Sequence, residues 1–353
     1  MDGFESKTAG SKRPVYPFGE KVPAVGETME VAPRIHWVRM PLPFSLKWIN
    51  LWLIEDDEGW TVVDTGMPLD ETKAAWRKIF GDKLGGKPVH RIIVTHMHPD
   101  HIGNAGWMRR KTSAAFWISR LEYITCRMLV ADTGRQAPEA GLRFYKEAGW
   151  DDEDIEHYKS RFGGFGRAIS RLPDAYFRLE DHFEFKMAGE TWRVIMGNGH
   201  SPEHACLYCR KLNVLISGDQ LLPRISSNVS VFPTEPEGNP LDDWMTSCAK
   251  LKAAVPPDVL VLPAHNEPFT GAHARLDALI RGHEIALKRL KKRLSESPRR
   301  VVDVFPAIFG RKIGRDVLSM ATGEALAHLN YLIEAGDAKR ELGRDGVALY
   351  SAV

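Results

Sequence analysis

The chain has 353 residues, of which 43% are hydrophobic and 27% charged, which is the composition of an ordinary folded protein larger than one average domain. Its formal net charge of +2 gives no overall attraction to nucleic acid or anionic membranes. There is no apolar run of about 18 or more residues, and residues 1–5 contain Asp2 and Glu5 where a secretory signal would have basic residues. We therefore expect a cytoplasmic protein without a membrane partner.

Residues 1–33 are rich in Gly, Pro, Lys and Glu and show no hydrophobic period, which predicts an extended N-terminal arm. A larger catalytic domain is expected over residues 34–275. Its first part places short apolar runs before and after an amphipathic segment, and this pattern predicts the order β-β-β-α-β-α. The expected strands are 35–40, 48–54, 60–63 and 91–94, and the expected helices are 70–80 and 104–111.

The most unusual stretch runs from Thr95 to Ala105 and reads T-H-M-H-P-D-H-I-G-N-A, directly after a strand-like run. Imidazole and carboxylate are ligands that suit zinc, iron or manganese. A histidine-rich surface loop is the alternative, but it does not explain why four such residues fall within six positions. The four candidate ligands are His96, His98, Asp100 and His101.

Residues 107–175 show no metal-type spacing and are expected to form a helical insertion, with helices near 121–130 and 140–148. A glycine-rich, aromatic and basic loop follows at 160–167. Two interpretations stay open. The insertion is either a lid or wall for a substrate pocket, or a helical excursion that only thickens the fold.

In the rest of the catalytic domain, three apolar runs each end in a turn that contains Gly or Pro and presents one potential ligand. Because the ends of several strands meet at one edge of an open sheet, we expect these ligands to converge. The runs 191–196, 214–218 and 259–262 lead to His200, Asp219 and His265, respectively.

Cys206 and Cys209 form a C-x-x-C pair inside a strand-like run. Residues three apart in a strand point to opposite faces, and the chain has no second pair at zinc-ribbon spacing. We therefore expect ordinary buried thiols here, rather than a redox or zinc site.

Residues 276–353 show a pattern of their own, with helices near 276–294 and 321–335 followed by two short strands. Helices followed by a β-wing predict a helical, winged-helix-like domain. The basic run Lys288 to Arg293 on its first helix would contact nucleic acid or would be a solvated face. The domain itself would bind nucleic acid or would serve for packing and dimerisation.

In this order, the candidate ligands make the chain resemble the metallo-β-lactamase-fold hydrolase superfamily, and Asp64-Thr65-Gly66 matches the first motif of that family. The C-terminal part is similar to the winged-helix tail of a subgroup related to glyoxalase II-type thioesterases and β-lactamase-like endoribonucleases. The resemblance implies an α/β fold, an αββα sandwich with a C-terminal winged-helix-like module.

The resemblance also implies a site for two divalent metal ions, with Asp219 bridging them. Asp64 would orient ligands by hydrogen bonding. The first ion would be held by His96, His98 and His200, and the second by Asp100, His101 and His265. We expect zinc, whereas iron and manganese accept the same ligands.

Two metals that share one water lower its pKa toward ~7 and give a hydroxide that attacks an electrophilic carbon or phosphorus. Asp100 or a metal-bound water would then carry a proton to the leaving group. The resemblance therefore implies hydrolysis without a serine or cysteine nucleophile.

The near-neutral charge and the insertion favour a small ester-like substrate, such as a thioester, a lactone or a related acyl compound. The alternatives are an endoribonuclease or phosphodiesterase acting on single-stranded nucleic acid, and β-lactam hydrolysis. A homodimer is an open option. The expected substrate contacts are His204 and two residues that follow Asp219, Arg224 and Asn228. For Arg224 and Asn228, an ordinary polar loop is the alternative.

Overall fold

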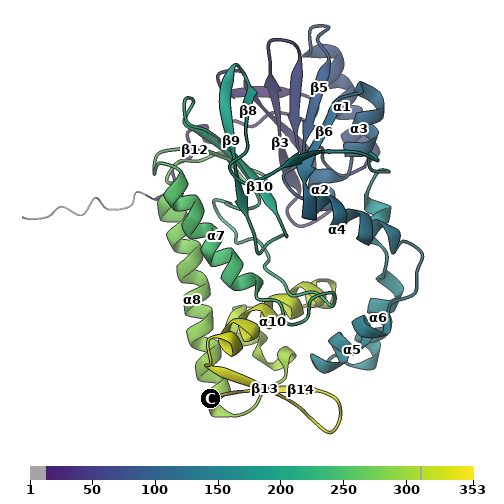
Figure 1. Cartoon of the computed structure of the whole chain (residues 1–353), viewed down its shortest axis with the longest axis vertical. Coiled ribbons are helices and arrows are strands. Elements are labelled where there is room, and N and C mark those ends of the chain that lie inside the picture. The colour runs from purple at the N-terminus through teal and green to yellow at the C-terminus, as the bar shows by residue number, and fades with distance from the viewer. Residues whose placement is uncertain (1–12, 311) are drawn as a thin grey trace, which may run out of the picture.

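The computed structural model describes residues 13–310 and 312–353 (Figure 1), so residues 1–12 of the expected N-terminal arm lie outside the described residues. The arm does not extend to residue 33, because strand β1 (Thr28–Ala32) already pairs antiparallel with β2 (Ile35–Pro41). Beyond it, two β-sheets face each other and helices cover their outer faces. The predicted α/β class and αββα layering are confirmed.

The first sheet has seven strands that follow chain order, antiparallel from β1 to β4 and parallel from β4 to β7. Side chains such as Trp76, Met108 and Cys126 pack helices against its outer face. The remaining strands are β3 (Trp48–Glu55), β4 (Trp60–Val63), β5 (Val89–Ile93), β6 (Ala115–Ser119) and β7 (Phe177–Leu179). The helices are α1 (Asp70–Asp82), α3 (Ala105–Thr112) and α4 (Arg120–Ala131), with the single turn α2 (Pro99–Ile102) before α3.

The second sheet has five strands in the order β12-β11-β10-β9-β8, and α7 (Pro240–Ala254) and α8 (Ala272–Glu296) lie along it. Cys206 packs in the cluster that contains the helices, and Cys209 packs between the sheets, so their predicted opposite orientation is confirmed. The strands are β8 (Glu184–Met187), β9 (Glu190–Gly197), β10 (His204–Cys209), β11 (Val214–Gly218) and β12 (Leu260–Pro263).

Residues 107–175 do not form a purely helical insertion. The apolar run Ala-Phe-Trp-Ile-Ser forms the strand β6, which pairs with β5 and β7 inside the first sheet. Periodicity alone does not separate so short an apolar run from a helix segment, and the sheet determines its conformation. The helical part comprises α4, α5 (Glu139–Glu147), α6 (Asp152–Arg161) and the short 3-10 helix η1 (Phe165–Ala168).

The C-terminal residues form helices followed by a two-stranded antiparallel sheet, and we call 297–353 the C-terminal module. Helix α8 starts at Ala272 and so runs through the expected boundary at 276. That the module is a winged helix stays a prediction. Its elements are η2 (Val301–Val304), α9 (Phe305–Ile308), η3 (Arg315–Val317), α10 (Leu318–Glu334), β13 (Ala338–Leu342) and β14 (Ala348–Ala352).

The C-terminal module packs against α5 and α6, although these helices lie far from it in the chain (Figure 1). Arg340 donates a hydrogen bond to Glu147, and Trp150 Nε1 donates one to Thr322 Oγ1 over 3.0 Å. Arg315 also pairs with carboxylates of α6. None of the helices in the described ranges is long and apolar enough to cross a membrane.

Asn50 on β3 ties the first sheet to the end of β12 and is buried. Its Oδ1 accepts a hydrogen bond from Trp37 Nε1 at 2.8 Å. Its Nδ2 donates to the carbonyl oxygens of Pro263 at 2.9 Å and Asn266 at 2.6 Å. The turn between these two residues, which carries His265, is therefore held by one buried amide.

We expect Asn50→Leu to lower the free energy of unfolding of the metal-free protein by about 3 kcal/mol, because it leaves a buried indole donor and a buried carbonyl without partners. Urea denaturation measures this change. The matched control is Asn330→Leu, whose amide binds two carbonyl oxygens of a more exposed loop. Equal losses in the two variants would contradict the role assigned to Asn50.

Candidate metal centre

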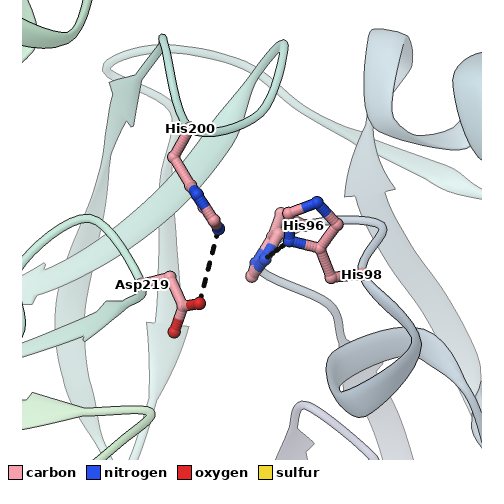
Figure 2. Close-up of side chains that lie close together, drawn as sticks. All are labelled: His96, His98, His200 and Asp219. Atoms are coloured by element: carbon pink, nitrogen blue, oxygen red, sulfur yellow. Dashed lines mark hydrogen bonds and ion pairs between the residues drawn. The ribbon is translucent and has the colours of Figure 1, made fainter. Parts of the chain in front are cut away.

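The ends of strands from both sheets bring together all seven predicted ligands, in two groups. Within each group the potential ligand atoms lie within 4.8 Å of one another. Figure 2 shows the members of the first group turned toward a common point, with two histidines from the first sheet facing His200 and Asp219 from the second. The first group is His96, His98, His200 and Asp219, and the second is Asp100, His101 and His265.

The carboxylate of Asp219 lies between the two groups. Its Oδ2 is 3.4 Å from His200 Nε2 in the first group. Its Oδ1 is 3.5 Å from His265 Nε2 and 3.6 Å from His101 Nε2 in the second. One oxygen therefore faces each group, which is the placement of a bridging ligand.

Three of these buried atoms, His101 Nε2, His200 Nε2 and Asp219 Oδ1, have no hydrogen-bond partner among the described residues. Buried polar atoms without partners are costly and rare in folded proteins. All three can act as electron-pair donors and all point into one small volume. A divalent cation is the group that satisfies them together, so the residues present fit a metal.

The outer nitrogens of two of the ligands are held by backbone carbonyls. His200 Nδ1 lies 2.7 Å from the oxygen of Asn228, and His265 Nδ1 lies 3.0 Å from the oxygen of Trp48. A carbonyl oxygen can only accept a hydrogen bond, so each Nδ1 carries the hydrogen and each Nε2 offers its lone pair to the centre. Such partners fix both the tautomer and the ring orientation of a ligating histidine.

Asp64 contacts His101 of the second group at Nδ1, the ring nitrogen that faces away from the other ligands. Its backbone has a φ of 61°, a left-handed conformation that aspartate tolerates better than most residues and that is common at functional sites. Its carboxylate accepts hydrogen bonds of 2.8 Å from Thr95 N and from Thr95 Oγ1, and it lies 2.8 Å from His101 Nδ1. The expected orienting role of Asp64 agrees with these contacts.

The charges of the site differ between the two groups. Burial opposes protonation of His101, but the nearby carboxylates outweigh it and raise its pKa to about 10. Burial and the neighbouring His200 lower the pKa of His98 to about 3, so this imidazole is neutral, which is the form that binds metal. The negative charge around His101 is the charge that would attract a cation.

Gly218 shows how closely the second sheet approaches the site. Its φ is +50°, and a Cβ atom there would lie 2.5 Å from Nε2 of His204. The same nitrogen accepts a 3.0 Å hydrogen bond from the backbone N–H of Asp219. His204 therefore holds the backbone of Asp219 from behind and stacks on His96 with a ring-centroid distance of 4.7 Å.

Glu122 is a site residue that sequence reasoning missed. It lies on α4, is fully buried, and accepts 2.8 Å hydrogen bonds from the backbone N–H groups of Met97 and Glu203. It thus joins the loop that carries His96 and His98 to the loop that follows His200. The available signal was a charged residue inside the apolar run of α4, which is weak without the structure.

A cavity of about 510 Å³ reaches His200 from the side of the helical insertion. Its walls are mostly apolar and come from α4, from residues 162–165 and from residues 230–234. Its charged lining consists of one cation, Arg161, and three carboxylates. Representative lining residues are Met97, Thr125, Met128, Tyr158, Phe165 and Phe232, and the carboxylates are Asp132, Glu235 and Asp243.

The three expected substrate contacts do not line this cavity. Arg224 is half exposed and pairs with Glu267 at 2.9 Å. Asn228 holds His200 through its backbone oxygen, and His204 is fully buried behind the ligands. The cavity therefore offers a different set of contacts, contributed by the insertion and by residues 230–243.

Comparison with known families identifies two regions of the chain. The model of the metallo-beta-lactamase superfamily matches residues 49–265. The model of the metallo-beta-lactamase-like C-terminal domain matches residues 287–353. The two matches cover most of the sandwich, all seven candidate ligands and the C-terminal module.

Two solved structures resemble the chain over nearly its whole length. A beta-lactamase domain protein from Burkholderia ambifaria is 39% identical with a TM-score of 0.87, and the match covers 96% of this chain and 98% of that one. A metallo-beta-lactamase family protein from Thermus thermophilus is 26% identical with a TM-score of 0.77, covering 92% and 100%.

Among curated proteins, a probable metallo-hydrolase of Bacillus subtilis is 23% identical over 84% of this chain and 91% of its own length. An atrochrysone carboxyl ACP thioesterase of Aspergillus fumigatus is 22% identical over 79% of this chain. A linear primary-alkylsulfatase of Pseudomonas is 26% identical over 62%. The matches span only 55% of the thioesterase and 42% of the alkylsulfatase.

The predicted resemblance is thus confirmed by the family models, by the fold and by the clustered histidines and aspartates at the strand ends. This chain belongs to the metallo-β-lactamase superfamily and is a hydrolase of that fold.

Proposed function

We propose that this protein is a zinc-dependent hydrolase of small acyl substrates, with thioesters and lactones as the substrate class. The observation that carries the proposal is the cavity of about 510 Å³ that opens beside His200. Its volume falls in the range of about 300–1,000 Å³ that is typical of small-molecule sites. Its mostly apolar wall suits the hydrocarbon part of an acyl group.

Two zinc ions would be held by the two groups of ligands, with Asp219 shared between them. Zinc is favoured because imidazole and carboxylate are ligands that it prefers, although iron and manganese accept the same set. When bound, the ions polarise the carbonyl of a substrate and make a water acidic enough to react near neutral pH.

The chain's own residues would orient the histidine ligands and transfer a proton. Asp64 keeps His101 oriented through its Nδ1, and the carbonyl of Asn228 does the same for His200. We assign to Asp100, whose Oδ2 lies 3.4 Å from His265 Nε2, the transfer of a proton to the leaving group.

A nucleic-acid substrate is less well supported. The cavity wall contains more carboxylates than cations, and these would repel a phosphodiester backbone. The basic run of α8 lies toward the end of that helix beside the C-terminal module (Figure 1). Two of its cations, Lys291 and Arg293, are already paired with Asp337 and Glu296. The similarity to ACP thioesterases also favours acyl transfer to water.

A substrate panel tests the proposal. We expect the zinc-loaded protein to hydrolyse acyl thioesters or lactones, octanoyl better than acetyl, and to leave β-lactams and short single-stranded RNA largely intact. Thiol release and product chromatography measure the outcome. RNA cleavage that Asp219→Ala abolishes, without turnover of any acyl substrate, would establish the endoribonuclease alternative.

Among the seven proposed ligands, Asp219 is the one that faces both groups, and Asp219→Ala removes it. Loss of a residue that only hydrogen-bonds to a metal ligand already costs about 10–100-fold in metal affinity or activity. For loss of a ligand itself, we expect kcat/KM to fall by at least about 100-fold. Elemental analysis should show fewer metal ions per chain. Asp181→Ala, which breaks an ion pair between the turn that precedes β8 and Lys250 on α7, is the control and should retain both.

Thr125→Trp fills part of the cavity from α4. We expect kcat/KM for an octanoyl thioester to fall by at least about tenfold, because even one displaced methylene is worth about 1–3 kcal/mol, with acetyl thioester hydrolysis unchanged. The control is Ile124→Trp, one residue away on the exposed face of the same helix. If the ratio of kcat/KM for the octanoyl and acetyl thioesters is the same in both variants, the cavity is not the acyl site.

A further inference from the structure

The support of His200 comes from a loop, residues 219–231, that contains no helix or strand. The carbonyl oxygen of Asn228 in this loop lies 2.7 Å from His200 Nδ1. Farther back, Ser227 Oγ donates a hydrogen bond to the backbone oxygen of Asp219. A segment without regular structure thus contains one proposed ligand, Asp219, and contacts another, His200, so its own conformation must be fixed from outside.

Helix α10 of the C-terminal module supplies that constraint. The side chain of Asn228 donates a 2.8 Å hydrogen bond from Nδ2 to Glu324 Oε2. Its Oδ1 accepts a 2.6 Å hydrogen bond from Ser230 Oγ. The backbone N–H of Val231 donates to the carbonyl oxygen of Gly323 at 3.0 Å.

The helix and the loop are in direct backbone contact at Gly323. A Cβ atom at this position would lie 2.7 Å from Cβ of Ser230 and 2.8 Å from the carbonyl oxygen of Val231. A larger residue would push α10 away from the loop. The contact therefore fixes the distance between the module and the support of His200.

Glu324 is an unusual residue to find at this contact. It forms no ion pair with any described residue, and burial raises its pKa to about 7, although the hydrogen bond from Asn228 opposes the shift. Placing a carboxylate there costs free energy that a leucine would not cost. Its one side-chain partner is the residue that orients a proposed metal ligand.

We propose that Glu324 is a positioning residue for metal binding. It fixes Asn228 and, through the backbone oxygen of that residue, the imidazole of His200. The C-terminal module therefore completes the metal centre, although it contributes none of the proposed ligands. The inference rests on the proposed metal-dependent function, since it assigns His200 as a ligand.

The experiment is a calorimetric titration of the full-length, metal-free protein with Zn²⁺. Residues outside the ligand set that hold a ligand contribute about 10–100-fold to metal affinity. Glu324 acts through one further residue, so we expect an effect near the lower end of this range. Glu324→Ala should weaken one of the two Zn²⁺ binding steps by about tenfold. Glu324→Gln keeps an acceptor for Asn228 and should restore affinity to within about twofold.

The matched control is Glu334→Ala. Glu334 lies on the same helix and accepts a 2.6 Å hydrogen bond from an asparagine side chain, Asn239, which does not contact a proposed ligand. We expect wild-type Zn²⁺ affinity in this variant. The proposal is overturned if Glu324→Ala binds Zn²⁺ like the wild type, or if Glu324→Ala, Glu324→Gln and Glu334→Ala all lose affinity equally.

Far-ultraviolet circular dichroism of the metal-free variants shows whether they fold. Should Glu324→Ala be unfolded, Asn228→Ala replaces it, since it breaks the same contact and keeps the backbone oxygen that faces His200. The same tenfold loss is expected, and unchanged affinity overturns the proposal. A wild type that binds Zn²⁺ but hydrolyses nothing refutes the proposed function alone, whereas a wild type that binds no Zn²⁺ refutes both.

Discussion

The structure depends on the burial of imidazole and carboxylate groups whose electron pairs all face one point. Asp219 lies at that point, with one oxygen toward His200 and the other toward His101 and His265. Without a cation, such a cluster leaves buried polar atoms unpaired, which favours other side-chain conformations. The surrounding residues must therefore hold the ligands in place. The hydrogen bonds of Asp64, Asn228 and the Trp48 carbonyl do this.

Much of this could be predicted from sequence, because the information is local. Potential ligands that follow apolar runs at Val94, Gly218 and Pro263 indicate strand ends that share an edge, and the two sheets place them there. The strand β6 was missed for the opposite reason. Its five residues carry no period that separates strand from helix, and only pairing with β5 and β7 defines it.

Apart from Asp64, which the family motif indicated, the supporting residues were not predictable, because their role depends on contacts distant in sequence. Glu122 and Glu324 look like ordinary charged residues of amphipathic helices, and their partners lie as far as 96 positions away. His204 is a residue type that often contacts substrates, yet strand β10 directs its side chain into the core behind His96. Residue type predicts what a side chain can bind, and topology decides what it meets.

The insertion and the C-terminal module also belong together physically. Tyr145, which lines the cavity, stacks on Trp150 at 4.1 Å, and Trp150 donates a hydrogen bond to Thr322 near the start of α10. Two residues farther along α10 is Glu324, which holds the support of His200. The wall of the cavity and the orientation of a proposed ligand are thus fixed by one helix, so a shift of α10 would alter both.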